Sequence, residues 1–263
     1  MSYETVALTR EGAVARLTLN RPEALNAIEP QMVADVGAAL AECASPEIHV
    51  VVLTGAGRAF CAGGDVKSMV DSFGGDATGF MRGLVTDFHD RIVLGIRNLP
   101  KPVLASINGV AAGGGLSLAL CCDLRIAADN ARFTMAYANI GLSADGGSSF
   151  FLPRLVGFGR ATELLMLAEP FDASKALELG LINRVVPAGE LEGATMDWAQ
   201  RLAAGATRAY GVVKSLLNRT FSNELSVQLD DETHGMTTLT QSADYREGIT
   251  AFAEKRRPVF RGT

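Results

Sequence analysis

Two glycine-rich stretches combine residue types that can do chemistry. Segments 60–66 (FCAGGDV) and 109–118 (GVAAGGGLSL) each end a run of strand-forming residues in glycines and lead into a predicted helix. The first N–H groups of a helix lack partners and carry a partial positive charge. Two such ends, held together, can direct two donors at one oxygen that becomes negative during a reaction, which is an oxyanion hole. For either stretch alone, the alternative is that glycine only permits a tight turn and close helix packing.

The composition limits the kind of protein. The chain has 263 residues, of which 48% are hydrophobic and 20% charged, as expected for an ordered globular protein with one sizeable core. Its net charge of -5 argues against a nucleic-acid partner. The N-terminal sequence lacks the apolar core of a signal peptide, and the uncharged segment 102–122 contains glycines and polar residues that make a poor membrane span. We therefore expect a cytoplasmic protein without a membrane partner.

The cysteines and histidines predict neither disulfides nor a metal site. Adjacent Cys121 and Cys122 cannot easily share one tetrahedral ion. The remaining cysteines and the histidines are scattered along the chain: Cys43, Cys61, His49, His89 and His234. Four cysteines in a chain this long do not make a disulfide framework. We expect reduced thiols and no metal ion.

The elements that must position the two glycine stretches follow an alternation of strands and helices. Residues 5–22 alternate apolar and polar side chains on both sides of Glu11-Gly12, which predicts an antiparallel hairpin. Further on, strand patterns alternate with helical patterns, which favours parallel pairing and an α/β core. The pattern of residues from about 190 to 255 predicts helix almost throughout. We place a domain boundary there, between residues 1–190 and 191–263.

Six segments, in this order, resemble the crotonase, or enoyl-CoA hydratase/isomerase, superfamily. They are NRPEALNAI, FCAGGDV, KPVLASINGVAAGGG, DLRIAADNARF, DASKALELGLINRVV and FAEKRRPVF, and they span nearly the whole chain. The resemblance implies an α/β fold: a crotonase-like spiral of ββα units (1–190), which binds acyl-CoA and performs catalysis, followed by a C-terminal helical trimerisation region (191–263). It also implies an acyl-CoA thioester substrate and a homotrimer or hexamer. No separate cofactor is implied, because coenzyme A is part of the substrate.

The resemblance also assigns residues to the site. The oxyanion donors would be the backbone N–H groups of Gly64 and Gly114. Residues matching the family's substrate and CoA contacts are Ala24, Leu25, Ala62, Gly63, Asp65, Val66, Phe252 and Lys255, the last two often acting across a subunit boundary. Asp65 has the alternative role of fixing the loop at a helix N-terminus. By itself, the basic segment around Lys255 would be an ordinary solvated tail.

The carboxylates of the sequence favour one reaction within this family. Hydratases of the family use two glutamates, and the matching positions here hold Ser117 and Tyr137, neither of which is a carboxylate base. Asp145 matches the catalytic acid of members that shift double bonds, including Δ3-Δ2-enoyl-CoA isomerases and the ring-opening isomerase of phenylacetate breakdown. One carboxylate beside an oxyanion hole suffices for allylic isomerisation, because no water is added. We therefore predict an enoyl-CoA isomerase with Asp145 as proton shuttle.

Each of these residues also has a structural alternative. Asp145 could cap the helix that follows it, and Ser117 fits a packing position on a helix face. Tyr137 would either line the acyl pocket or fill core. His89 lies near the apolar stripe of its helix, a position that favours a hydrogen-bonded core histidine over a catalytic base.

Several functional alternatives stay open at this point. Within the family they are a hydratase of fatty-acid or aromatic-acid degradation, a dehalogenase with Asp145 as nucleophile, and a thioester hydrolase. Outside catalysis, the chain could be an inactive acyl-CoA-binding subunit. Residues 70–84 are expected to cover the acyl end, but acyl specificity, pathway and the choice between trimer and hexamer are not readable from the sequence.

Overall fold

A β-hairpin begins the fold, as the alternating pattern predicts. The computed structural model describes residues 3–263. Strand β1 (Val6–Glu11) pairs antiparallel with β2 (Val14–Leu19) around Gly12, whose φ is +58°. A short 3₁₀ turn, η1 (Pro22–Ala24), then leads to helix α1 (Pro30–Glu42). The α1 N-terminus is capped by Glu29, whose carboxylate accepts the N–H groups of Gln31 and Met32.

Each later turn of the chain supplies one strand to each of two sheets. The larger sheet has the order β1-β2-β3-β5-β7-β10, with every pair after the hairpin parallel, and the smaller has the order β4-β6-β8-β9. A helix follows the strand pairs β3-β4, β5-β6 and β7-β8, which makes the ββα spiral that the resemblance implies. The remaining strands are β3 (Val50–Gly55), β4 (Ala59–Cys61), β5 (Val103–Ile107), β6 (Val110–Ala112), β7 (Leu124–Ala128), β8 (Arg132–Thr134), β9 (Phe171–Asp172) and β10 (Arg184–Val186).

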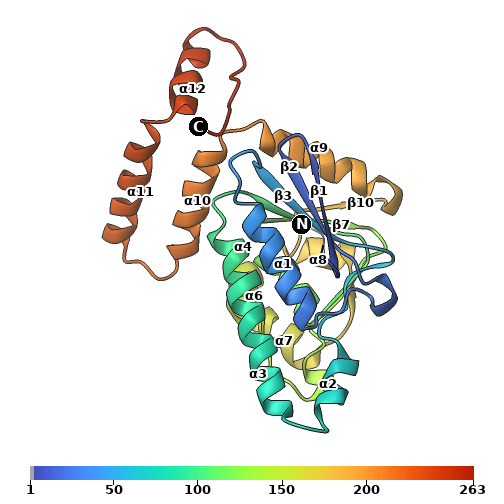
Figure 1. Cartoon of the computed structure of the whole chain (residues 1–263). Helices are drawn as coiled ribbons and strands as arrows, with labels where there is room; N and C mark the ends of the chain where they lie inside the picture. Colours follow the sequence, from blue (N-terminus) through green and yellow to red (C-terminus); the bar gives the residue numbers. More distant parts are fainter. Residues whose placement is uncertain (1–2) are drawn as a thin grey trace.

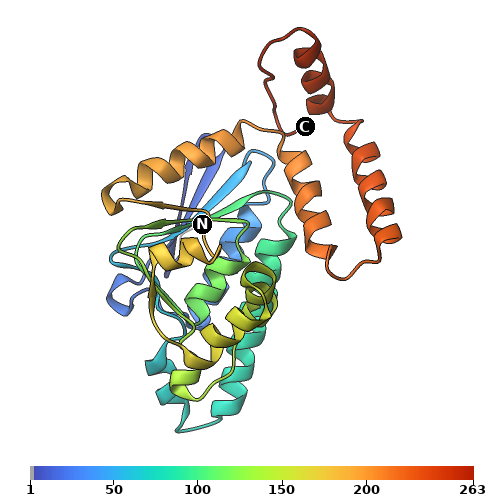
Figure 2. The same ribbon diagram turned by 180° about the vertical axis from the view of Figure 1, so that it is seen from behind.

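Helices cover the sheets and extend the molecule at both ends. In Figures 1 and 2, α2 and α3 lie at one end and α12 at the other. Helices α3 and α4 are joined by a π-helical segment, η2 (Phe88–Val93). The helices are α2 (Val66–Ser72), α3 (Ala77–Asp87), α4 (Leu94–Asn98), α5 (Gly114–Cys121), α6 (Ser148–Val156), α7 (Phe158–Leu167), α8 (Ala173–Glu178), α9 (Leu191–Ala203), α10 (Thr207–Arg219), α11 (Leu225–Leu239) and α12 (Ala243–Ala253), with 3₁₀ turns η3 (Ala138–Ile140) and η4 (Ala188–Glu190).

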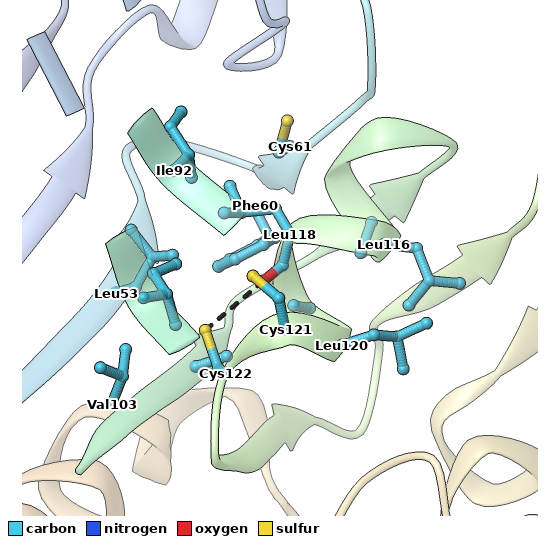
Figure 3. Close-up of a cluster of buried hydrophobic side chains, with 14 of the residues drawn as sticks. Leu53, Phe60, Cys61, Ile92, Val103, Leu116, Leu118, Leu120, Cys121 and Cys122 are labelled. Carbon is cyan, nitrogen blue, oxygen red and sulfur yellow. Dashed lines mark hydrogen bonds between the residues drawn. The ribbon is translucent and has the colours of Figure 1, made fainter. Parts of the chain in front are cut away.

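The core lies around α5, all eight residues of which are buried. Figure 3 shows its leucines packed with Phe60 and Ile92, and the thiol of Cys122, which donates to the carbonyl of Leu118 at 3.4 Å. All four cysteines are free and buried. Burial raises the pKa of the Cys61 thiol to about 12, so this group stays protonated at neutral pH. Because α5 is buried on every side, its first residue, Gly114, is held in a fixed position.

The C-terminal helices fall into two groups. Helix α9 packs on the larger sheet, where Leu191 and Ala199 join a second core cluster with Val50 and Leu104. Helices α10, α11 and α12 stand apart from the sheets (Figures 1 and 2). The domain boundary at residue 190 falls between η4 and α9 and stays a prediction. Within residues 3–263, no helix is both long enough and apolar enough to cross a membrane.

Candidate active site

Two backbone amides are left free where the glycine-rich loops meet. Strand β4 leads to Gly64 through Gly63 (φ +95°), and β6 leads to Gly114 through Gly113 (φ +48°). Within residues 3–263, the N–H groups of Gly64 and Gly114 have no acceptor. The amides beside them are bonded: Ala62 to Leu25 O at 3.0 Å, Asp65 to Ile28 O at 2.8 Å and Gly113 to Thr134 O at 2.9 Å. The predicted oxyanion donors thus have no acceptor, although each directly adjoins an amide that is hydrogen-bonded.

These amides open into one cavity of about 370 Å³, whose wall includes Gly63, Gly64, Gly113 and Gly114. The two loops touch, since a Cβ built on Gly63 would lie 3.4 Å from the Gly114 nitrogen. The geometry therefore allows one ligand oxygen to accept from both sides.

The glycines do not all serve the same purpose. A Cβ on Gly115 would lie 2.0 Å from the Cys61 carbonyl oxygen, so this glycine is required for packing. A Cβ on Gly114 would make one tight contact, with the flexible end of Ile28 at 3.2 Å, and ordinary contacts of 3.9 Å with Gly63 and Tyr137. The packing alternative therefore holds for Gly115, whereas Gly114 presents its amide to the cavity.

The loop around Gly64 is fixed by Asp65. Its carboxylate accepts the N–H groups of Lys67 (3.0 Å) and Ser68 (3.3 Å), which caps α2, and it pairs with Arg21 at 2.9 Å. The loop-fixing role considered for Asp65 is therefore what its side chain does. Its pairing with Arg21 also ties the loop to the segment that carries Ala24.

The other residues predicted to contact CoA fall into two places. Leu25, in the left-handed region at φ +51°, accepts from the Ala62 amide, so Ala24, Leu25 and Ala62 lie beside the Gly64 loop, as does Val66, which is 58% exposed. Phe252 lies on α12 and Lys255 lies just after it, at the opposite end of the molecule from α2 (Figure 1). Both residues are exposed. A single chain does not bring them to the cavity.

A hydrogen-bonded chain of three side chains ends at Asp145. The Tyr137 hydroxyl donates to Asp145 Oδ1 and lies 2.7 Å from Ser117 Oγ, which also reaches the Gly113 carbonyl at 3.2 Å. Ser117 and Tyr137 are buried, whereas Asp145 is half-buried on the cavity wall. Tyr137 and Ser117 stand at the two positions where the family resemblance places hydratase glutamates. Tyr137 contacts the Asp145 carboxylate directly, and Ser117 contacts it through the Tyr137 hydroxyl.

Burial and neighbouring groups act in opposite directions on Asp145. Burial raises the pKa of its carboxyl above the ordinary range, while the Tyr137 hydrogen bond and the nearby His89 lower it in part. Burial, together with the Asp145 charge, also raises the pKa of Tyr137, so its hydroxyl keeps its proton as a donor. A carboxylate with a raised pKa is better suited to taking up and returning a proton than an exposed one.

The capping role considered for the Asp145 side chain is wrong. Gly146 and Gly147 have φ of +58° and +78°, and Gly147 occupies the cap position of α6 without a side-chain bond. The Asp145 backbone carbonyl accepts from Ser148 N–H (3.0 Å) and Oγ (2.9 Å), while its carboxylate turns to Tyr137. Two left-handed glycines therefore separate the side chain from the helix end.

The rest of the cavity wall is mostly apolar. Residues 70–84 contribute Met81 and Leu84, and His89 also lines the cavity. The His89 ring is hydrogen-bonded, as considered from the sequence, because its Nε2 accepts the Gly146 N–H at 3.0 Å. Its place at the cavity was missed, since a histidine beside an apolar helix stripe gives no sign of which cavity it faces. The other apolar side chains of the wall include Ile28, Met69, Val85, Phe88, Ile140 and Leu142.

Comparisons with known proteins agree with this geometry. The family model described as enoyl-CoA hydratase/isomerase matches residues 9–263. The chain is 40% identical over 263 residues to a probable enoyl-CoA hydratase of Rhodobacter capsulatus, with 100% of both chains covered. It is 41% identical over 254 residues to the 1,2-epoxyphenylacetyl-CoA isomerase of Escherichia coli, with 96% of each covered. The crystal structure of an enoyl-CoA hydratase from Polaromonas sp. JS666 matches with a TM-score of 0.92 at 39% identity, over 97% of this chain and 99% of that one.

Proposed function

The chain belongs to the enoyl-CoA hydratase/isomerase family, and from this premise we propose that it is an enoyl-CoA isomerase that shifts a double bond with Asp145 as proton shuttle. One observation carries the proposal. Within residues 3–263, Asp145 is the only carboxylate on the wall of the cavity that holds the free amides of Gly64 and Gly114. A single acid–base group fits proton transfer between two carbons of one substrate. Hydration needs both an activated water and a proton donor, for which the wall offers no second carboxylate.

The reaction follows from the positions of these groups. The thioester carbonyl of a 3-enoyl-CoA accepts from the Gly64 and Gly114 N–H groups, which stabilise the negative charge that develops on its oxygen. Asp145 removes a proton from C2, and the electron pair of the broken C–H bond forms a conjugated dienolate. Asp145 then returns the same proton to C4, which leaves the double bond between C2 and C3. No atom is gained or lost, so no cofactor is needed.

The same proposal extends to CoA binding and assembly. Phe252 is 86% exposed and Lys255 is exposed, and both lie far from their own cavity. We propose that a neighbouring subunit of a homotrimer or hexamer supplies them to the CoA nucleotide, with Lys255 as a cation for phosphate. Exposed apolar side chains on the three terminal helices, including Leu217, Leu229 and Ile249, are consistent with such an interface. A monomer in sedimentation at working concentration would contradict this assembly.

A substrate panel tests the function. Purified protein is given 3-enoyl-CoA and 2-enoyl-CoA thioesters of several acyl groups, and conjugated product and hydrated product are measured separately. Formation of the 2-enoyl product from the 3-enoyl substrate supports the proposal. Faster hydration of 2-enoyl-CoA would replace it with a hydratase function, and binding without turnover would indicate an acyl-CoA-binding subunit.

Asp145→Asn completes the test, because asparagine keeps the shape and removes the base. Isomerisation should fall by about 10²–10⁴-fold, while acyl-CoA affinity stays near that of the wild type, since binding depends on backbone amides and other residues. A variant that keeps more than half of the wild-type rate at saturation would exclude Asp145 as the catalyst.

A further inference from the structure

The hydrogen bond between Tyr137 and Asp145 has a defined direction. A hydroxyl has one proton, and the Tyr137 proton is donated to Asp145 Oδ1. The Tyr137 oxygen is then left to accept, and Ser117 Oγ can donate to it at 2.7 Å in place of the longer bond to the Gly113 carbonyl at 3.2 Å. The chain therefore runs from Ser117 to Tyr137 to Asp145, and its terminal acceptor is the carboxylate in its charged form.

The same contact orients the two carboxylate oxygens. Oδ1 is held by Tyr137, whereas Oδ2 has no hydrogen-bond partner within residues 3–263. Tyr137 also lies against the oxyanion hole, because a Cβ built on Gly114 would be 3.9 Å from its hydroxyl oxygen. One oxygen is thus fixed beside the hole and the other is left to exchange a proton.

Few other charges act on this carboxylate. Within the described chain, the titratable side chains on the cavity wall are His89, Tyr137 and Asp145. Helix α5 and turn η3, which pack nearby, carry no charged residue. The charged side chains of the other neighbouring elements are exposed: Lys67 and Asp71 of α2, Arg82 and Asp87 of α3, Asp90 and Arg91 of η2, and Arg154 of α6. The Tyr137 hydroxyl is therefore a main local influence that opposes the effect of burial.

We propose that Tyr137 is a positioning residue for the proton transfer, whose hydroxyl, itself oriented by Ser117, holds the Asp145 carboxylate beside the Gly64 and Gly114 amides. Ser117 and Tyr137 thereby have a role in place of the two glutamates of a hydratase. Without the Tyr137 donor, Asp145 would keep its burial and lose its main hydrogen bond. The carboxyl would then hold its proton to higher pH and would be free to rotate.

The test is the pH dependence of the reaction in Tyr137→Phe, which keeps the ring in the core and removes only the hydroxyl. A hydrogen bond to a charged group corresponds to about 1–2 pKa units, so the acid limb of kcat/KM should move to higher pH by that amount. Ser117→Ala should move the limb in the same direction by less. Tyr245→Phe, on the distant α12, is the matched control and should leave the limb in place.

A second readout does not depend on the proposed function, on which the kinetic readout rests. With ¹³C-labelled aspartate, the carboxyl signal of Asp145 is assigned by its loss in Asp145→Asn and titrated in wild type and Tyr137→Phe. A wild type without isomerase activity would overturn the proposed function, while this titration would still decide on Tyr137. An Asp145 titration that does not change in Tyr137→Phe overturns the proposal. A lower rate with an unmoved acid limb also overturns it, because that is the result of a purely structural role.

Discussion

His89 Nε2 accepts a hydrogen bond of 3.0 Å from the backbone N–H of Gly146, a residue 57 positions further along the chain. Gly146 directly follows Asp145, so this bond ties the loop that carries the carboxylate to the π-helical segment η2. Gly146 is also confined by packing, since a Cβ there would lie 2.7 Å from both Phe88 and Ser117. His89 acts here as an acceptor that fixes the loop, and its Nε2 is not free to act on substrate.

Removing this acceptor should loosen the loop. In His89→Leu the buried Gly146 N–H loses its partner, at a cost of about 1–3 kcal/mol in the free energy of unfolding. His89→Gln is the matched variant, because its amide oxygen can accept the same N–H. Denaturant unfolding should rank wild type and His89→Gln above His89→Leu, and the leucine variant should also lose turnover. Equal stability of the two variants would show that the bond contributes nothing.

Asp145→Asn should lower the rate of isomerisation but should not lower the stability of the fold at pH 7. Because burial raises the pKa of Asp145 in the folded state, the folded chain binds a proton that the unfolded chain has already released. Stability from this group is present at low pH and is lost as pH rises through the folded pKa. At pH 7 the variant should therefore melt at or above the wild-type temperature, and the gap should close below about pH 4, near the ordinary aspartate pKa. A lower melting temperature at pH 7 would contradict this sign.

Much of the fold was predictable from local pattern. The strand alternation around Gly12 and the glycines after β4 and β6 are local features, and the structure confirms the hairpin. It also confirms the ββα order, which the family resemblance implied. The π-helical segment η2 was not predictable, because an apolar stripe does not distinguish it from an α-helix. The isomerase function and the CoA contacts were inferred from the family resemblance, and they stay predictions.

The chain from Ser117 to Asp145 could not be predicted from spacing. It depends on the pairing of β6 with β8, which sets Ala112 opposite Thr134 and so brings the residues after each strand together. Register between strands is a non-local property, since it is decided by packing of the whole sheet. The capping role of Asp145 was wrong for a local reason, because the left-handed conformations of Gly146 and Gly147 are not encoded by glycine alone.

Asp123 anchors the C-terminal helices to the core and should be important for stability. Its carboxylate accepts from Lys214 of α10 (2.7 Å), Arg97 of α4 (3.0 Å) and the Val103 N–H (2.8 Å). Lys214 is only 6% exposed, and burial lowers its pKa while Asp123 raises it in part. Asp123→Ala leaves that buried cation with one carbonyl acceptor and should cost about 3–5 kcal/mol. Lys214→Met should cost less, because Asp123 keeps its other two donors.

Urea unfolding of these two variants measures the difference. The control is Glu47→Ala, which removes an exposed ion pair with Arg10 and should cost about 0–1 kcal/mol. If Asp123→Ala unfolds as easily as the control, the anchor is not a stabilising contact.

Proline at position 114 removes the amide hydrogen that we propose as an oxyanion donor. Gly114 is the first residue of α5, where proline is tolerated because the N–H has no partner within the helix. Gly114→Pro therefore deletes the proposed donor, and the rate of isomerisation should fall by about 10²–10³-fold, as for other single oxyanion donors. Gly114→Ala is the matched control: it keeps the N–H and adds a methyl group whose one tight contact is with the end of Ile28.

The comparison of these two variants decides the role of the amide. Both introduce a Cβ at the same place, so a steric effect of the Cβ would lower both rates together. The proline Cδ also takes the place of the amide hydrogen, so affinity for a non-reactive acyl-CoA is measured to separate loss of the donor from blocked binding. Loss of the donor lowers only the proline variant, in turnover more than in affinity for a non-reactive acyl-CoA, because the hydrogen bond strengthens as charge develops on the thioester oxygen. Melting temperatures of both variants check that each is folded. If folded Gly114→Pro turns over substrate as fast as Gly114→Ala, the Gly114 N–H does not stabilise the enolate.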